Sequence, residues 1–146
     1  SMEPITVKNS LVLMPPRLLM DAIVSVKHAD KTVEKGHLNQ YETIKVPAAG
    51  AALAMPLGHY DLTGVASLKV GGWSVQQDNK WKLELHTGSA TGPLLAEADW
   101  AGGLNNYGRT QLAITPRTGF EDLYLVVRSE QKNLGELQLF DVSFHQ

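Results

Sequence analysis

The stretches YDLTGVASLKVGGW (Tyr60–Trp73) and WKLELHTGSATGPLLAE (Trp81–Glu97) decide the fold of this chain. In the second stretch, apolar and polar residues alternate one by one from its first position. The apolar set is Trp81, Leu83 and Leu85, and the polar set is Lys82, Glu84 and His86. A period of two places one set on the buried face of a β-strand and the other in solvent. We therefore predict a half-buried strand here, with the Trp81 side chain in the core.

Similar short apolar segments, bounded by Gly or Pro, recur on both sides of this stretch at intervals of about a dozen residues. The expected strands are residues 5–7, 11–14, 21–26, 41–46, 51–57, 65–75, 81–87, 93–98, 109–114, 122–128 and 136–144. Between them we expect a surface loop over 27–39, a turn over 57–60, and a bulge or bend at Gly71-Gly72. No segment has a helical period. This pattern predicts an all-β fold, a β-sandwich of jelly-roll type.

Length and composition limit the function classes. The 146 residues fit one domain over the whole chain, with Ser1-Met2 interpreted as the remnant of an expression tag. The net charge of −2, without a dense run of Lys or Arg, argues against nucleic acid or an anionic membrane as partner. The absence of cysteine excludes disulfides and thiolate chemistry.

Catalytic patterns are missing from the sequence. Glu97 and Asp99 lie two residues apart on an expected strand, where a solvated face is the simpler interpretation than a glycosidase pair. The five histidines are dispersed without metal-ligand spacing. No G-x-S-x-G elbow and no glycine-rich phosphate loop occur. We therefore expect that the chain is not an enzyme.

One loop, residues 100–109, combines aromatic and amide side chains. Its candidate ligand-binding residues are Trp100, Asn105, Asn106, Tyr107 and Arg109. Sugars are bound by aromatic faces and by hydrogen-bonding side chains together, so this composition is typical of a glycan site. The alternative is a glycine-rich turn whose aromatic residues only cap the sandwich edge. Trp73 fits either the core or such a site.

Four motifs resemble a known family. They are DLTGVASLKV, WKLELHTGSATGPLLAE, GFEDLYLVV and ELQLFDVSF, and they span roughly residues 57–144. In these motifs the chain resembles the family-6 carbohydrate-binding modules. The resemblance implies a β-jelly-roll fold and binding of glycans. It also implies attachment to a secreted polysaccharide-active enzyme or, in more distant relatives, to cytochrome c or sugar-dehydrogenase domains.

The resemblance also implies where the family's ligand site lies. Its Tyr position falls near Leu57 or His59, with Tyr60 close by, and its Trp position falls near Asn106 or Tyr107. Its Asn position falls near Gln138, with Asn133 on the preceding loop. We expect a site at the sandwich edge, formed by the 100–109 loop and bordered by residues 57–60 and 133–138. Because the aromatic pair of the family is not clearly kept, we expect weak binding.

A structural calcium ion is a further feature of the family. The candidate ligands in this chain are Asp21 and Asp141, whereas the N-terminal acidic pair of the family is absent. Calcium takes six to eight oxygen ligands, and few are found here. We expect no tightly bound calcium and no other cofactor.

The leading hypothesis is a non-catalytic carbohydrate-binding module of a secreted multidomain protein, extracellular or periplasmic and monomeric as an isolated domain. It would bring a partner domain to an oligo- or polysaccharide. The alternative hypothesis is a structural or docking module that packs against a neighbouring redox or hydrolase domain and binds no sugar.

Overall fold

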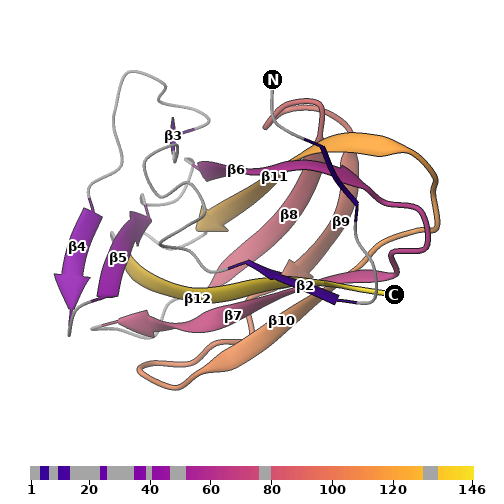
Figure 1. Cartoon of the computed structure of the whole chain (residues 1–146). Coiled ribbons are helices and arrows are strands. Elements are labelled where there is room, and N and C mark those ends of the chain that lie inside the picture. The colour runs from indigo at the N-terminus through magenta and orange to yellow at the C-terminus, as the bar shows by residue number, and fades with distance from the viewer. Residues whose placement is uncertain are drawn as a thin grey trace.

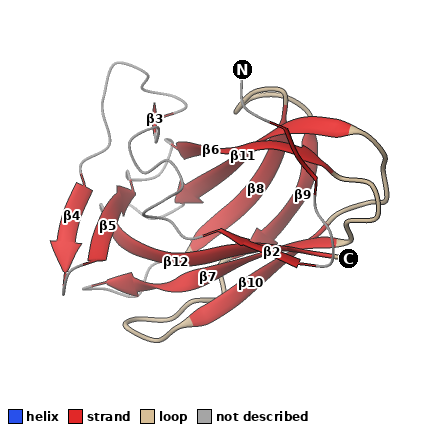
Figure 2. Cartoon of the chain, in the orientation of Figure 1, coloured by secondary structure: helices blue, strands red, loops and turns tan. Residues whose placement is uncertain are grey.

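A computed structural model describes residues 4–6, 10–13, 24–25, 35–38, 41–46, 52–75, 80–129 and 135–146, and the side chains of residues 52–75, 80–128 and 135–146. Within these ranges the chain forms β-strands and turns and no helix (Figure 2). The strands are β1 (Pro4–Thr6), β2 (Ser10–Leu13), β3 (Val24–Ser25), β4 (Lys35–Leu38), β5 (Tyr41–Val46), β6 (Ala52–Asp61), β7 (Ser67–Val75), β8 (Trp81–Thr87), β9 (Leu94–Asp99), β10 (Gly108–Ala113), β11 (Phe120–Ser129) and β12 (Gly135–His145).

These strands form two sheets that face each other (Figure 1). The β6 sheet has the order β1-β6-β11-β8-β9, with β3 also paired to β6. The β7 sheet has the order β10-β7-β12-β5-β4, with β2 also paired to β12. Strand β1 runs parallel to β6, and the other pairings are antiparallel. The predicted all-β sandwich of jelly-roll type is confirmed.

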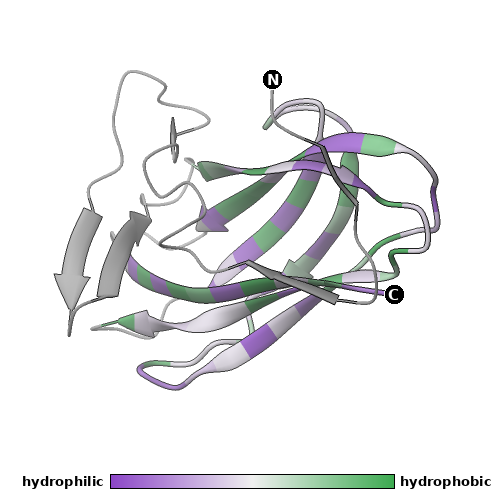
Figure 3. Cartoon of the chain, viewed as in Figure 1, coloured by the Kyte–Doolittle hydropathy of each residue, from purple (hydrophilic) through white to green (hydrophobic). Residues whose placement is uncertain are grey.

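The core lies between the two sheets and follows the predicted alternation. Leu83 and Leu85 are fully buried and Trp81 is 3% exposed, and hydrophobic and hydrophilic residues alternate along β8 (Figure 3). The β7 sheet contributes the facing side chains, among them Val70 and Phe144. Burial of such side chains stabilises a fold by roughly 1.5–3 kcal/mol each. The prediction that Trp81 belongs to the core is confirmed.

The polar face of β8 differs from the expectation at His86, which is buried. The turn after β8 folds back, so that the carbonyl of Gly92 lies 2.8 Å from His86 Nδ1. On the other side, His86 Nε2 lies 2.8 Å from a Glu84 carboxylate that also accepts a hydrogen bond from Arg128 Nε. Burial alone would raise the pKa of Glu84, but the two hydrogen bonds outweigh it and lower this pKa. His86 therefore joins β8 to its own turn and is not in solvent.

Two segments that we expected to be connections between strands belong to strands themselves. Residues 57–60, expected as a turn, continue β6 to Asp61, and β6 pairs along its length with β11. Within 27–39, expected as a loop, residues Lys35–Leu38 form β4 at the edge of the β7 sheet. The pairing of β4 with β5 is made by backbone groups. An edge strand of this kind needs no apolar alternation, which is why the sequence pattern missed it.

The irregularity expected at Gly71-Gly72 is present, but the extra residue belongs to the neighbouring strand. Strand β7 runs without interruption, whereas in β12 the register shifts between Leu139 and Asp141, opposite Gly72 and Gly71. The residue left over is Phe140. Because a bulge resets the alternation, Phe140 and Asp141 both face outward while Leu139 is buried in the core.

Replacing Trp81 with alanine tests the core assignment. The indole fills the interface between the sheets, so Trp81→Ala should lower the free energy of unfolding by about 3–5 kcal/mol. Urea denaturation measures this change. Leu94→Ala is the matched control, because Leu94 is 49% exposed on β9 and its loss should change stability little. Equal effects of the two substitutions would contradict the assignment.

Candidate functional site

The loop between β9 and β10 is fixed to β7 by backbone hydrogen bonds. The Ser74 amide donates to the Gly103 carbonyl at 2.9 Å, and the Asn105 amide donates to the Ser74 carbonyl at 2.7 Å. The loop tip is a tight turn in which Asn105 has a φ of 49°, a conformation that asparagine tolerates better than most residues. Asn105 and Asn106 are exposed at this tip. The loop is thus anchored at its centre and presents its two ends in different directions.

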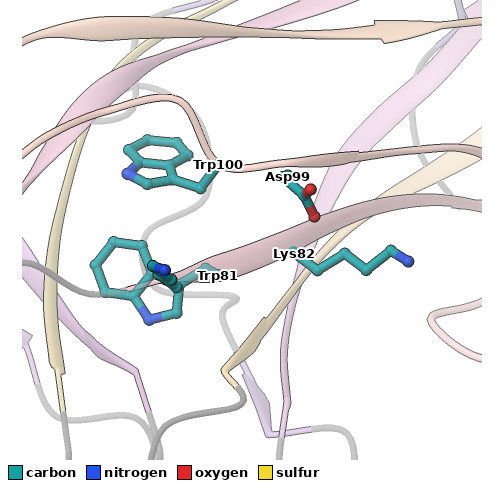
Figure 4. A pocket seen from close by; sticks show the side chains of 5 residues that line it. Trp81, Lys82, Asp99 and Trp100 are labelled. Atoms are coloured by element: carbon teal, nitrogen blue, oxygen red, sulfur yellow. The ribbon is translucent and has the colours of Figure 1, made fainter.

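The first end of the loop turns Trp100 towards the core. Its ring packs edge-on against Trp81 with the centroids 5.8 Å apart, and the Trp100 amide donates to the Trp81 carbonyl at 2.9 Å. A pocket of about 460 Å³ lies beside the two rings (Figure 4). Its lining residues are Lys80, Trp81, Lys82, Asp99 and Trp100. The Nε1 atoms of both indoles are buried and have no hydrogen-bond partner in the described part of the chain.

The second end of the loop turns Tyr107 outward, onto the outer face of the β7 sheet. There it meets Trp73 of β7 and Phe140 of the β12 bulge, and we call these three residues the aromatic platform. Their ring centroids lie 6.0–6.2 Å apart pairwise. Tyr107 is 43% exposed, and Trp73 and Phe140 are partly exposed. Exposed aromatic rings gathered from three segments differ from isolated surface residues and indicate an interaction surface.

Asp141 holds the Tyr107 hydroxyl in place at the edge of the platform. The Tyr107 hydroxyl donates to Asp141 Oδ2 at 2.7 Å. Both groups lie over Gly71, where a β-carbon would come within 2.5 Å of Asp141 Oδ1 and closer still to the Tyr107 hydroxyl. Burial raises the pKa of the Tyr107 phenol and the nearby Asp141 carboxylate raises it further, while Arg109 acts in the opposite direction. Tyr107 therefore remains a neutral hydrogen-bonding phenol at physiological pH.

Arg109 continues the polar edge of the platform along the sheet. Its Nη2 donates to Ser143 Oγ at 3.0 Å, and Ser143 Oγ lies 2.7 Å from His145 Nε2. Burial, followed by the charges of Lys69 and Arg109, lowers the pKa of His145. The outer face of the β7 sheet therefore carries aromatic rings at one end and donor groups beside them.

Two of the predicted site residues lie at the other end of the molecule. His59 hydrogen-bonds Asp122 at 2.6 Å and stacks on Phe120, whereas Trp81, which touches Trp100, pairs with Ser129 at the opposite end of β11. Seven residues of extended strand separate Asp122 from Ser129, which is about 23 Å. The prediction that residues 57–60 lie beside the 100–109 loop is wrong, because β6 continues past the position of the expected turn.

Tyr60 is not available to a ligand, since it is 1% exposed in the core. Its hydroxyl donates to the Leu57 carbonyl at 2.7 Å, and burial raises its pKa to about 12. Gln138 is 4% exposed and pairs in register with Trp73, so it lies on the same face of the sheet as Trp73 but is buried there. Asn133 and Asp21 fall outside the described residues. The described residues include no group of three or more His, Cys, Asp or Glu that could hold a metal.

The family assignment follows from comparison with known proteins. The model of the family "Carbohydrate binding module (family 6)" matches residues 31–144. The chain belongs to this family. It is a non-catalytic carbohydrate-binding module. None of the curated proteins matches its sequence. No helix among the described residues has the length and apolar character to cross a membrane.

Solved structures share the fold of the module at low sequence identity. A family-6 module from Clostridium stercorarium in complex with cellobiose has a TM-score of 0.62 at 14% identity, with 93% of each chain covered. A β-1,3-glucan-binding module from Bacillus halodurans has a TM-score of 0.57 at 18% identity, covering 85% of this chain and 95% of the other. An arabinoxylan arabinofuranohydrolase from Bacillus subtilis, in complex with cellotetraose, has a TM-score of 0.62 at 16% identity. The match covers 99% of the module and 28% of that enzyme.

Sequence reasoning missed Phe140 as a candidate site residue of the module. The sequence contained a signal for it. A period of two from the buried residues Leu137 and Leu139 predicts the next core positions at 141 and 143, but the buried residues are Val142 and Phe144. This change of phase indicates one inserted residue between Leu139 and Val142. The sequence left two interpretations of Trp73, a core residue or a site residue. In the structure it lies on the outer face beside Phe140.

Titration of Tyr107 tests the geometry of the polar edge. Asp141→Asn removes a negative charge that disfavours the phenolate, so the pKa of Tyr107 should fall towards the ordinary value of about 10. Arg109→Gln removes a cation that favours the phenolate, so the same pKa should rise. The NMR shift of Tyr107 Cζ through an alkaline titration measures both. Shifts of the same sign in the two variants would contradict the arrangement.

Proposed function

We propose that the module binds its glycan on the aromatic platform, the outer face formed by Trp73, Tyr107 and Phe140. The observation that carries this proposal is the gathering of three partly exposed rings within 6.0–6.2 Å of one another on one sheet face. Pyranose rings present apolar C–H faces that pack on aromatic rings, and their hydroxyls need hydrogen-bonding groups at the rim. The rim of the platform carries such a group, the exposed Arg109 guanidinium.

The platform is a better candidate than the pocket beside Trp100. The Trp81 ring is 3% exposed, and Trp100 packs on the hydrophobic core. Trp81 therefore offers a sugar no free face, and the partly buried Trp100 ring turns towards the core. Tyr107, in contrast, is 43% exposed and fixed in place by its hydrogen bond to Asp141. A rigid, exposed ring loses little conformational entropy when a ligand packs on it.

The expected affinity is low, because the platform is an open surface that covers one side of a sugar ring. A Kd on the order of 0.1–1 mM corresponds to about 4–5.5 kcal/mol. Longer oligosaccharides should bind more tightly than monosaccharides, since a sheet face can hold more than one sugar unit.

The biological role follows from binding without catalysis. The module keeps a covalently attached partner domain near a polysaccharide, which raises the effective concentration of that domain at its substrate. Polysaccharides are too large to cross a membrane unaided, so the parent protein acts outside the cell or in the periplasm. The isolated module is monomeric.

Truncation of the exposed ring tests the site. Tyr107→Ala should weaken binding of soluble oligosaccharides at least about ten-fold, because it removes the stacking surface of the platform. Isothermal titration calorimetry with a panel of plant, algal and bacterial oligosaccharides measures the affinity. The matched control is Leu94→Ala, which removes an equally exposed apolar side chain from β9 of the other sheet.

Equal affinities of Tyr107→Ala and the unsubstituted module would show that the glycan binds elsewhere. If no member of the panel binds at millimolar concentration, the docking hypothesis takes the place of this proposal. The platform would then be a contact surface for a neighbouring domain.

A further inference from the structure

We propose that the sugar bound on the aromatic platform carries a carboxylate, so that the ligand is a glycan containing uronic acid. This inference rests on the proposed function, because it names the ligand class for the same surface. The observation behind it is a pair of cations, Lys69 and Arg109, on the same sheet face as the platform. Neither has an acidic partner among the residues that the structure describes.

Three other cations in the described part of the chain have glutamate partners, whereas Lys80, just before β8 in the other sheet, has none. Lys82 binds Glu97 at 3.1 Å, Arg117 binds Glu121 at 2.5 Å and Arg128 binds Glu84 at 2.9 Å. No ion pair joins Lys69 or Arg109 to a carboxylate in the described part of the chain. The protein therefore leaves two positive charges uncompensated on the face that carries its exposed rings.

Arg109 is held in place by neutral groups, which leave its charge available. Ser143 Oγ accepts a hydrogen bond from Arg109 Nη2, so the hydroxyl hydrogen is free to be donated to His145 Nε2. Burial, followed by the charges of Lys69 and Arg109, lowers the pKa of His145 and so favours its neutral form. The chain of hydrogen bonds from Arg109 through Ser143 to His145 orients the guanidinium without an anion, and a ligand can supply the anion.

Arg109 also lies at the correct place for a sugar stacked on Tyr107. It follows Tyr107 by two residues and pairs in register with Gly71, over which the Tyr107 hydroxyl lies. The carboxylate of a uronic acid projects from the edge of its pyranose ring. When the C–H face of that ring packs on Tyr107, the carboxylate can reach sideways to the guanidinium, whose planar donors suit a carboxylate.

The acidic group nearest to the platform does not cancel these charges. Asp141 accepts the Tyr107 hydroxyl through Oδ2, and its Oδ1 is buried. Its carboxylate therefore faces the protein. Glu136 lies further along β12, opposite Val75. Lys69 and Arg109 are therefore the charges on this face that a ligand beside Tyr107 can meet.

The test compares two tetrasaccharides with one backbone. One consists of β-1,4-linked glucuronate, and the other is its carboxyl-reduced form, cellotetraose. The module should bind the glucuronate form about ten-fold more tightly at low ionic strength, because a charge-assisted hydrogen bond is stronger than a neutral one. This preference should shrink as salt is added. Arg109→Gln should abolish the preference, and Lys69→Gln should reduce it.

Lys80→Gln is the matched control, since Lys80 is an exposed cation beside β8 of the other sheet; it should leave the preference unchanged. Equal affinity for the two tetrasaccharides overturns the uronic-acid inference and leaves the proposed site intact. A preference that survives Arg109→Gln also overturns it. Failure of both sugars to shift the NMR signals of Tyr107 overturns the uronic-acid inference, and the proposed site falls with it if the wider oligosaccharide panel also leaves these signals in place.

Discussion

The pairing of β7 with β12, and the bulge within it, is the constraint on which the outer face of the module depends. Opposite Gly71 and Gly72, β12 holds one residue more than β7, and this residue is Phe140. The bulge brings Phe140 and Asp141 to the same side, while Leu139 and Val142 remain in the core. Without the inserted residue, Asp141 would point into the apolar interior, where an unpaired carboxylate is costly. Core packing and the aromatic platform therefore require the same register.

The same region explains how one loop serves two purposes. The loop between β9 and β10 is tied to Ser74 by two backbone hydrogen bonds. On one side Trp100 packs on Trp81 and closes the end of the sandwich, and on the other side Tyr107 lies over Gly71. The indole that caps the core and the phenol that faces solvent are thus fixed relative to each other. A site built in this way is preorganised, which limits the entropy lost on binding.

The sequence was sufficient for the fold, and it named two residues of the face that we propose as the binding site. The alternation through Trp81, Leu83 and Leu85 predicted the buried face of β8. Tyr107 and Arg109, candidates by composition, lie on the proposed binding face. His59 and Tyr60 were misplaced because a strand continuing to Asp61 was interpreted as a turn. Contacts outside the strand pattern decided the rest. His86 is covered by the turn that follows β8, and Phe140 is exposed by a register shift opposite Gly71. The change of phase within β12 indicates the bulge, but a pattern in one segment does not show which residues of other segments lie beside it.

The most direct test of the account follows the three tryptophan side chains in one NMR experiment. Each indole Nε1–H gives its own signal, and the chain has three tryptophans. If the glycan binds on the sheet face, titration with an oligosaccharide ligand should shift the Trp73 indole signal. The signals of Trp81 and Trp100 should stay in place. Shifts of Trp81 and Trp100 with an unchanged Trp73 would place the ligand in the pocket beside Trp100 and contradict the account.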